Sequence, residues 1–116
     1  MIQLNRRCFC FVVEPAAANR VRMPSPWSLD EPMSPHELRE MRDFFWSTAP
    51  KARRGRRVIW EALRDAAECG DLDVKQRLLD MHNIRLGNPD MTICIDGSGT
   101  RYKLPMYVLS DPTNLN

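Results

Sequence analysis

The chain has 116 residues and a formal net charge of +2; 43% of its residues are hydrophobic and 28% are charged. This length and composition are typical of one small globular domain. The longest uninterrupted apolar run, residues 8–13, has six residues, whereas a transmembrane helix needs roughly 20. We therefore expect no membrane bundle. The mild charge does not indicate nucleic acid as the partner, because nucleic-acid-binding domains usually carry a clearly basic face.

The cysteines and histidines do not form a recognisable metal or redox motif. They are scattered along the chain at Cys8, Cys10, His36, Cys69, His82 and Cys94. No cysteine pair has the C-x-x-C spacing of a zinc or thioredoxin-like site, and neither histidine stands next to a cysteine. We expect free thiols in a reducing compartment, with no metal and no cofactor.

Residues 1–26 differ from the rest of the chain because they are rich in proline and alanine. Arg6 and Arg7 followed by the apolar run 8–13 resemble a signal peptide, but the run is shorter than the 7–15 residues required and Glu14 follows at once. The arginines and the single acidic residue make a mitochondrial leader a second option. A flexible N-terminal segment over residues 1–26 is the favoured interpretation.

The folded domain is expected over residues 27–112, beginning with a helix at Ser34. Ser34 and Glu37 have the spacing of a capping box, and Pro35 stands at the first helical position. This helix should end before Pro50, because the residue preceding a proline avoids the α region. Its apolar residues recur at helical spacing: Leu38, Met41 and Phe45, with Phe44 beside them.

Two further helices should follow. Small and apolar residues give the second helix one continuous face, and Gly70 is its expected C-terminal cap. Asp71 or Asp73 starts the third helix, which should present Val74, Leu78 and Met81 on one side. The face of the second helix comprises Val58, Ile59, Ala62, Leu63, Ala66 and Ala67.

The pattern changes from helix to strand near the C-terminus. Residues 83–86 are expected to be extended, and residues 91–95 and 100–104 alternate around the glycine-containing turn 96–99, which predicts a β-hairpin. Residues 104–109 should continue extended, and residues 113–116 form a tail. The predicted fold is α+β: a small helical bundle of three to four helices followed by a β-hairpin.

No catalytic constellation can be assembled from the sequence. His36 in a first helical turn is expected on the surface, and His82 should complement a helix dipole. The string Asp96-Gly97-Ser98-Gly99 has the wrong order for an aspartic-protease loop and the wrong ending for a phosphate-binding loop. We therefore expect a binding module that is not an enzyme.

Two groups of residues are candidates for partner binding. The basic loop, Lys51, Arg53, Arg54, Arg56 and Arg57, could bind phosphate or serve as a nuclear localisation signal, or could simply be solvated. The tryptophans are the second group. They could equally well anchor a binding partner or shield the small hydrophobic core: Trp27, Trp46 and Trp60.

Several blocks of the sequence resemble the N-terminal domain of the ubiquitin domain-containing protein family, also called dendritic-cell-derived ubiquitin-like protein. Residues 42–50 read Arg-Asp-Phe-Phe-Trp-Ser-Thr-Ala-Pro, and residues 55–63 read Gly-Arg-Arg-Val-Ile-Trp-Glu-Ala-Leu. Residues 83–86 match an Asn-Ile-x-Leu block. The hairpin of the family is matched by Asp96, Gly99, Tyr102, Leu104-Pro105 and Tyr107.

The resemblance covers about residues 27–112 and implies a helical domain with a short hairpin that binds ubiquitin or a ubiquitin-like domain weakly. It also implies contact with a ubiquitin-conjugating enzyme, and no catalysis.

The chain departs from the family pattern in three ways. The family carries a ubiquitin-like domain after this one, and we expect none here because the sequence ends at Asn116. Ile2 stands where myristoylation needs a glycine, and the loop at residues 51–54 is more arginine-rich than in the family.

We therefore expect a non-enzymatic adaptor of the ubiquitin system, located in the cytoplasm with the nucleus as the alternative. Its partners would be ubiquitin or a ubiquitin-like domain and a ubiquitin-conjugating enzyme. A phosphate- or nucleic-acid-binding module and a structural part of a larger assembly remain alternatives. The residues expected to form the binding patch lie in extended segments flanking the core: Trp27, Leu29, Met33, Met106 and Tyr107.

Overall fold

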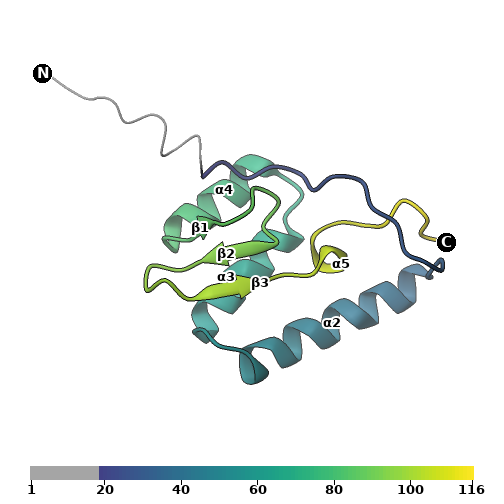
Figure 1. Cartoon of the computed structure of the whole chain (residues 1–116), viewed down its shortest axis with the longest axis horizontal. Helices are drawn as coiled ribbons and strands as arrows, with labels where there is room; N and C mark the ends of the chain where they lie inside the picture. Colours follow the sequence, from purple (N-terminus) through teal and green to yellow (C-terminus); the bar gives the residue numbers. More distant parts are fainter. Residues whose placement is uncertain (1–18) are drawn as a thin grey trace, which may run out of the picture.

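The computed structural model describes residues 19–116, so the alternatives for residues 1–18 lie outside the described residues. The elements are helices α2 (Pro35–Ala52), α3 (Arg57–Glu68) and α4 (Leu72–Met81), strands β1 (Arg85–Leu86), β2 (Ile93–Ile95) and β3 (Arg101–Lys103), and helix α5 (Met106–Leu109). The strands form an antiparallel sheet in the order β1-β2-β3. Figure 1 shows this sheet over α3, with α4 and α2 on either side. The predicted α+β fold of helices followed by a hairpin is confirmed.

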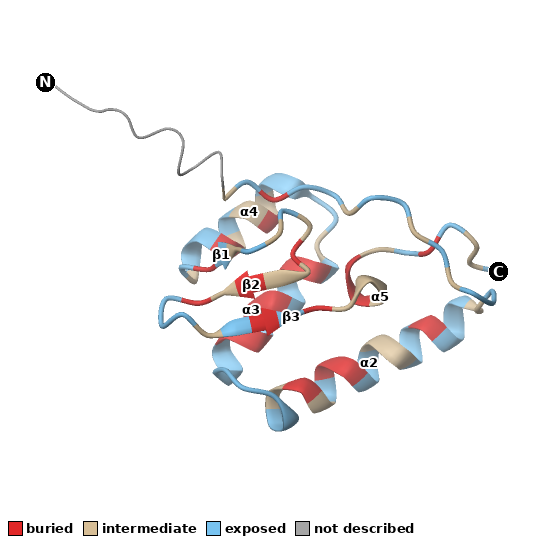
Figure 2. Ribbon diagram, viewed as in Figure 1, coloured by how far each residue is buried: buried red, intermediate tan, exposed pale blue. Residues whose placement is uncertain are grey.

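The core lies between α3 and the sheet and is closed by α2 and α4, whose buried residues face inward in Figure 2. Trp46 and Trp60 are 5% and 1% exposed, so both belong to this core. Trp60 packs edge-on against Tyr102 with ring centres 5.0 Å apart, and Phe45 packs edge-on against Trp60 at 6.1 Å. These aromatic contacts connect α2, α3 and the sheet.

Helix α2 continues through Pro50 to Ala52, so the predicted end before Pro50 is wrong. The proline ring removes a backbone donor but its fixed φ is helical. Packing compensates for the missing hydrogen bond: Ala49 is buried at 1% exposure, and the Arg53 guanidinium lies over the Phe45 ring at 5.2 Å. The Arg53 amide also donates to the Ala49 carbonyl, which caps the helix.

The buried face of α3 is mostly as predicted, because Ile59, Ala62, Leu63, Ala66 and Ala67 are buried, but one residue on each of α3 and α4 differs. Val58 is 48% exposed and Met81 75% exposed, although both were placed on the packed faces. Helix α3 also buries Trp60, and α4 buries Lys75 and Leu79 while the predicted Val74 and Leu78 are half-buried. The Trp60 ring is buried because it packs edge-on against Phe45 and Tyr102 in the aromatic cluster of the core.

The ends of two elements also differ from the sequence-based expectation. Cys69, with extended backbone, caps α3, so Gly70 is not the cap. Residues 106–109 form helix α5 and are not extended. Two consecutive buried residues, Val108 and Leu109, suit a helical turn that follows the fixed backbone of Pro105.

The N-terminal strap, which we define as residues 19–33, runs along the molecule from α4 to the start of α2 (Figure 1). Val21 is buried at 5% exposure, so part of the segment expected to be flexible packs onto the core. The strap also pairs with the C-terminal residues: the Thr113 amide donates to the Trp27 carbonyl at 2.8 Å, and the Asn116 amide donates to the Met33 carbonyl at 2.9 Å. These contacts are non-local and leave no periodic pattern in the sequence.

Tyr102 on β3 joins the hairpin to the loop between α2 and α3. Its hydroxyl donates to the Asp96 carboxylate at 2.7 Å and accepts from the Arg56 amide at 3.0 Å. Gly55 lies so close to the Tyr102 ring, with φ of +109°, that a Cβ atom would stand 2.3 Å from it. Any other residue at position 55 would displace the ring or the loop.

We predict that Gly55→Ala lowers the free energy of unfolding by about 3 kcal/mol, because it combines a clash with backbone strain. Gly99→Ala separates the two effects, since Gly99 has φ of +87° but open space around it. Gly99→Ala should lower the free energy of unfolding by only about 1 kcal/mol, from backbone strain alone. Gly70→Ala, with neither feature, should change stability by less than about 1 kcal/mol. Urea unfolding of the three variants is the measurement, and equal losses at positions 55 and 99 would contradict the close packing.

Titration of the Asp96 carboxylate should make the stability of the fold depend on pH. Burial raises the pKa of Asp96, but hydrogen bonds from Tyr102, Thr100 and Ser98 outweigh it and hold the pKa below its ordinary value. The unfolded chain therefore binds this proton more readily, so stability is present above about pH 4 and is lost as pH falls through the folded pKa. Urea unfolding across this range should show a shallower acid slope in Asp96→Asn. The exposed control Asp65→Asn should keep the wild-type slope, and an unchanged slope in Asp96→Asn would exclude this role.

Candidate partner-binding surface

The five residues predicted to form a binding patch do not form one continuous surface. Trp27 and Leu29 are half-buried in the N-terminal strap and are bonded to the C-terminal residues: the Trp27 indole donates to the Ser110 hydroxyl at 2.9 Å. Met33 and Tyr107, 74 positions apart, line one groove on the surface. Met106 is half-buried at the start of α5 and does not line it. The structure therefore brings together two of the five.

The apolar groove has a volume of about 390 Å³ and lies beside α2 and α5. Its other apolar residues are Met41 and Phe44, and Phe44 is 70% exposed. Sequence reasoning missed these two because it placed them on the packed face of α2. The adjacent phenylalanines were an available signal, since neighbouring helical residues point about 100° apart and Phe45 already faces the core.

Two glutamates give the groove an acidic rim. Glu37 and Glu40 line it. The capping box is confirmed: the Ser34 hydroxyl accepts from the Glu37 amide at 3.1 Å, and the Glu37 carboxylate accepts from the Ser34 amide at 3.0 Å. These hydrogen bonds lower the pKa of Glu37, so its negative charge persists at the groove into mildly acidic solution. Glu40 forms an exposed pair with His36 at 3.4 Å.

Tyr107 is fixed in the groove by contacts with α2. Its ring packs edge-on against Phe45 with centres 6.4 Å apart. Its carbonyl accepts from the Arg42 guanidinium, which also pairs with Asp111 at 2.9 Å. The groove wall formed by α5 is thus pre-organised relative to α2, which reduces the ordering that binding would require.

A second hollow, of about 490 Å³, shares Tyr107 with the apolar groove. It carries Ile93, Leu104 and Pro105 as apolar residues and has positive charge from Arg53 and Lys103. Tyr107 therefore separates an apolar surface with acidic neighbours from one with basic neighbours. A partner that covers Tyr107 can contact both surfaces.

The basic loop presents its five side chains to solvent: Lys51, Arg53, Arg54, Arg56 and Arg57. Its backbone is held in place, because the Trp60 indole donates to the Arg54 carbonyl at 3.1 Å and the Arg56 amide donates to Tyr102. None of the five forms an ion pair with a residue in the described range 19–116. The loop is a well-positioned source of uncompensated positive charge.

The cysteines and histidines of residues 19–116 lie on different elements of the fold. Within residues 19–116 there is no group of three metal-ligating side chains, and no helix there is long and apolar enough to span a bilayer. Cys94 is free and fully buried, and burial raises the pKa of its thiol to about 12, so it is not a nucleophile at neutral pH. His36 is exposed on α2, and His82 caps the end of α4.

A family model and the curated relatives of this chain point to the same protein family. Residues 17–116 match the family described as ubiquitin-binding domain. Ubiquitin domain-containing protein 1 is 47% identical in Danio rerio over 92 residues, which cover 77% of this chain and 40% of the relative. Its Homo sapiens counterpart is 43% identical over 105 residues, 88% of this chain and 44% of the relative. The chain spans less than half the length of these curated relatives. The family match and the fold agree with the resemblance noted in the sequence, and the chain belongs to the ubiquitin-binding domain family.

Proposed function

We propose that this chain is a non-catalytic module of the ubiquitin system that binds ubiquitin or a ubiquitin-like domain through the apolar groove. The main support for the proposal is that Phe44 is 70% exposed in a groove that is also lined by Met33, Met41 and Tyr107. A large aromatic side chain left in water next to other apolar groups is a typical centre of a protein-binding surface. The family description supports ubiquitin as the ligand.

The charge around the groove indicates the chemistry of the bound face. Glu37 and Glu40 line an otherwise apolar surface. A partner with a small apolar patch bordered by basic side chains would complement it. The groove is small compared with stable interfaces, so weak, rapidly reversible binding is expected, as is common for ubiquitin recognition.

We predict that Phe44→Ala weakens ubiquitin binding about tenfold or more, because it removes the aromatic anchor of the groove. Its high exposure means that the fold should remain intact. Met81→Ala is a matched control: Met81 is 75% exposed on α4, away from the groove. The measurement is an NMR titration of the ¹⁵N-labelled chain with ubiquitin, with shifts expected around the groove in the wild type. Absence of shifts at millimolar ubiquitin, or equal affinity of the two variants, would contradict the proposal.

A ubiquitin-conjugating enzyme is the second proposed partner. The support is the hollow beside the groove, in which Ile93 and Leu104 lie next to the positive charges of Arg53 and Lys103. Because Tyr107 lines both surfaces, a conjugating enzyme there would compete with ubiquitin at Tyr107 or contact it simultaneously. The same titration with a conjugating enzyme tests this proposal, and no shifts around Lys103 would contradict it.

Phosphate or nucleic-acid binding by the basic loop is the alternative function. It is favoured by the five exposed side chains, none of which forms an ion pair with another described residue. Such binding would weaken steeply as salt increases, because each phosphate contact releases counterions.

A variant with Arg53, Arg54 and Arg57 changed to glutamine distinguishes the two functions. We predict that its affinity for ubiquitin stays within about twofold of wild type, since these residues do not line the groove and exposed charges contribute little at physiological salt. Fluorescence anisotropy with a DNA duplex is the parallel measurement. Salt-sensitive duplex binding that the variant loses, together with no ubiquitin binding by the wild type, would favour the alternative.

A further inference from the structure

Lys75 occupies a core-facing position on α4 and is only 3% exposed. Lysine is almost never buried unless its ammonium is paired. In the described part of the chain, the Lys75 ammonium forms no ion pair. Burial lowers the pKa of Lys75, and the nearby Cys69, which also lines the cavity, acts in the opposite direction without reversing the shift.

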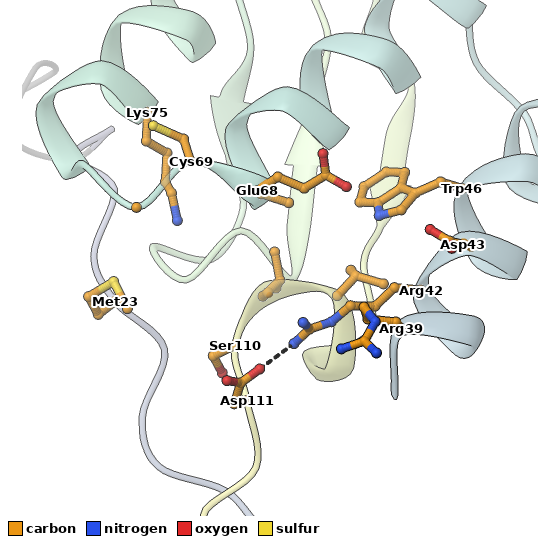
Figure 3. Close-up of a pocket in the computed structure, with 14 residues that line it drawn as sticks. Met23, Arg39, Arg42, Asp43, Trp46, Glu68, Cys69, Lys75, Ser110 and Asp111 are labelled. Atoms are coloured by element: carbon orange, nitrogen blue, oxygen red, sulfur yellow. Dashed lines mark hydrogen bonds and ion pairs between the residues drawn. The ribbon is translucent and has the colours of Figure 1, made fainter. Parts of the chain in front are cut away.

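Lys75 lines a cavity of about 490 Å³ that α2 and α5 also line. Figure 3 shows the side chain directed into this cavity, with Met23 of the N-terminal strap on one side. The cavity and the apolar groove use different sides of α2: Arg39, Asp43 and Trp46 line the cavity, whereas Glu40 and Phe44 line the groove. The cavity is therefore a separate site from the proposed ubiquitin-binding groove.

The acidic groups of the cavity already have arginine partners. Asp111 pairs with Arg42 at 2.9 Å (Figure 3). Arg64 lies between the other two acids, 3.1 Å from the Glu68 carboxylate and 3.7 Å from that of Asp43. None of these acids is within ion-pair distance of Lys75.

The uncompensated charges that line the cavity are positive. Lys75 and Arg39 both line it, and neither forms an ion pair with any residue from 19 to 116. Lys75 lies on α4 and is buried, whereas Arg39 lies on α2 and is exposed. Figure 3 shows the two charged groups apart in the cavity, so an anion that reaches the buried part of the cavity would pair with Lys75 alone.

The remaining walls define the ligand further. Trp46, Val108 and Leu109 are buried apolar residues at the cavity, so an apolar group can accompany the anion. The acidic side chains nearby disfavour a doubly charged phosphate, and the single charge of Lys75 suits a single carboxylate. We propose that this cavity binds a carboxylate that a partner protein presents on an acidic residue next to an apolar one.

Lysine NMR provides a direct test, because the chain has three lysines: Lys51, Lys75 and Lys103. With ¹³Cε-labelled lysine, each gives one signal. The probe is the blocked dipeptide acetyl-Leu-Glu-amide, and the Lys75 signal should move saturably while the other two stay in place. The neutral analogue acetyl-Leu-Gln-amide should bind at least about tenfold more weakly, as should acetate and inorganic phosphate.

Variants give a second readout. Lys75→Met removes the charge but keeps an unbranched chain in an apolar place, so the fold should persist and binding should fall at least about tenfold. Lys103→Met, at an exposed position on β3, should bind the peptide as wild type does. An unmoved Lys75 signal, equal shifts of all three lysines, equal binding of the Glu and Gln peptides, or tighter binding of phosphate would overturn the proposal. The test contains no ubiquitin, so its outcome is independent of the groove.

Discussion

The Tyr102 side chain is the contact on which the arrangement of helices and sheet depends. Its ring packs on Trp60 of α3 and over Gly55, and its hydroxyl connects the Arg56 amide to the buried Asp96 carboxylate. One residue on β3 thereby fixes the hairpin, the start of α3 and the loop after α2. Because the hydroxyl is satisfied on both sides, burying it does not leave an unpaired polar group.

Fixing that loop also sets the orientation of α2. Phe45 packs against Trp60 and Tyr107, so one side of α2 faces the core. The two sides next to it remain open to solvent: Phe44 lies in the apolar groove, and Arg39 lies at the cavity that contains Lys75. A single long helix can therefore offer two surfaces of different chemistry, one apolar with an acidic rim and one with unpaired positive charge.

Structural features that depend on neighbouring residues could be predicted from the sequence. Features that depend on packing between distant residues could not. The Ser34–Glu37 capping box is a local interaction, and it was predicted correctly. Pro50 follows a local rule that tertiary packing overrides, and residues 104–109 have a pattern that a strand or a helical turn can satisfy. In the candidate site, sequence proximity could not show that Met33 and Tyr107 meet, because that contact depends on how α5 packs on α2.

The interaction that most needs a direct test is the proposed binding of ubiquitin in the apolar groove at Phe44. A photoreactive phenylalanine analogue at position 44, or at the equally exposed position 81, would be irradiated with ubiquitin present. We expect a covalent ubiquitin adduct from position 44 and little from position 81, with the adduct mapping to an apolar ubiquitin face bordered by basic residues. Equal adduct yields from the two positions, or an adduct only from position 81, would contradict it.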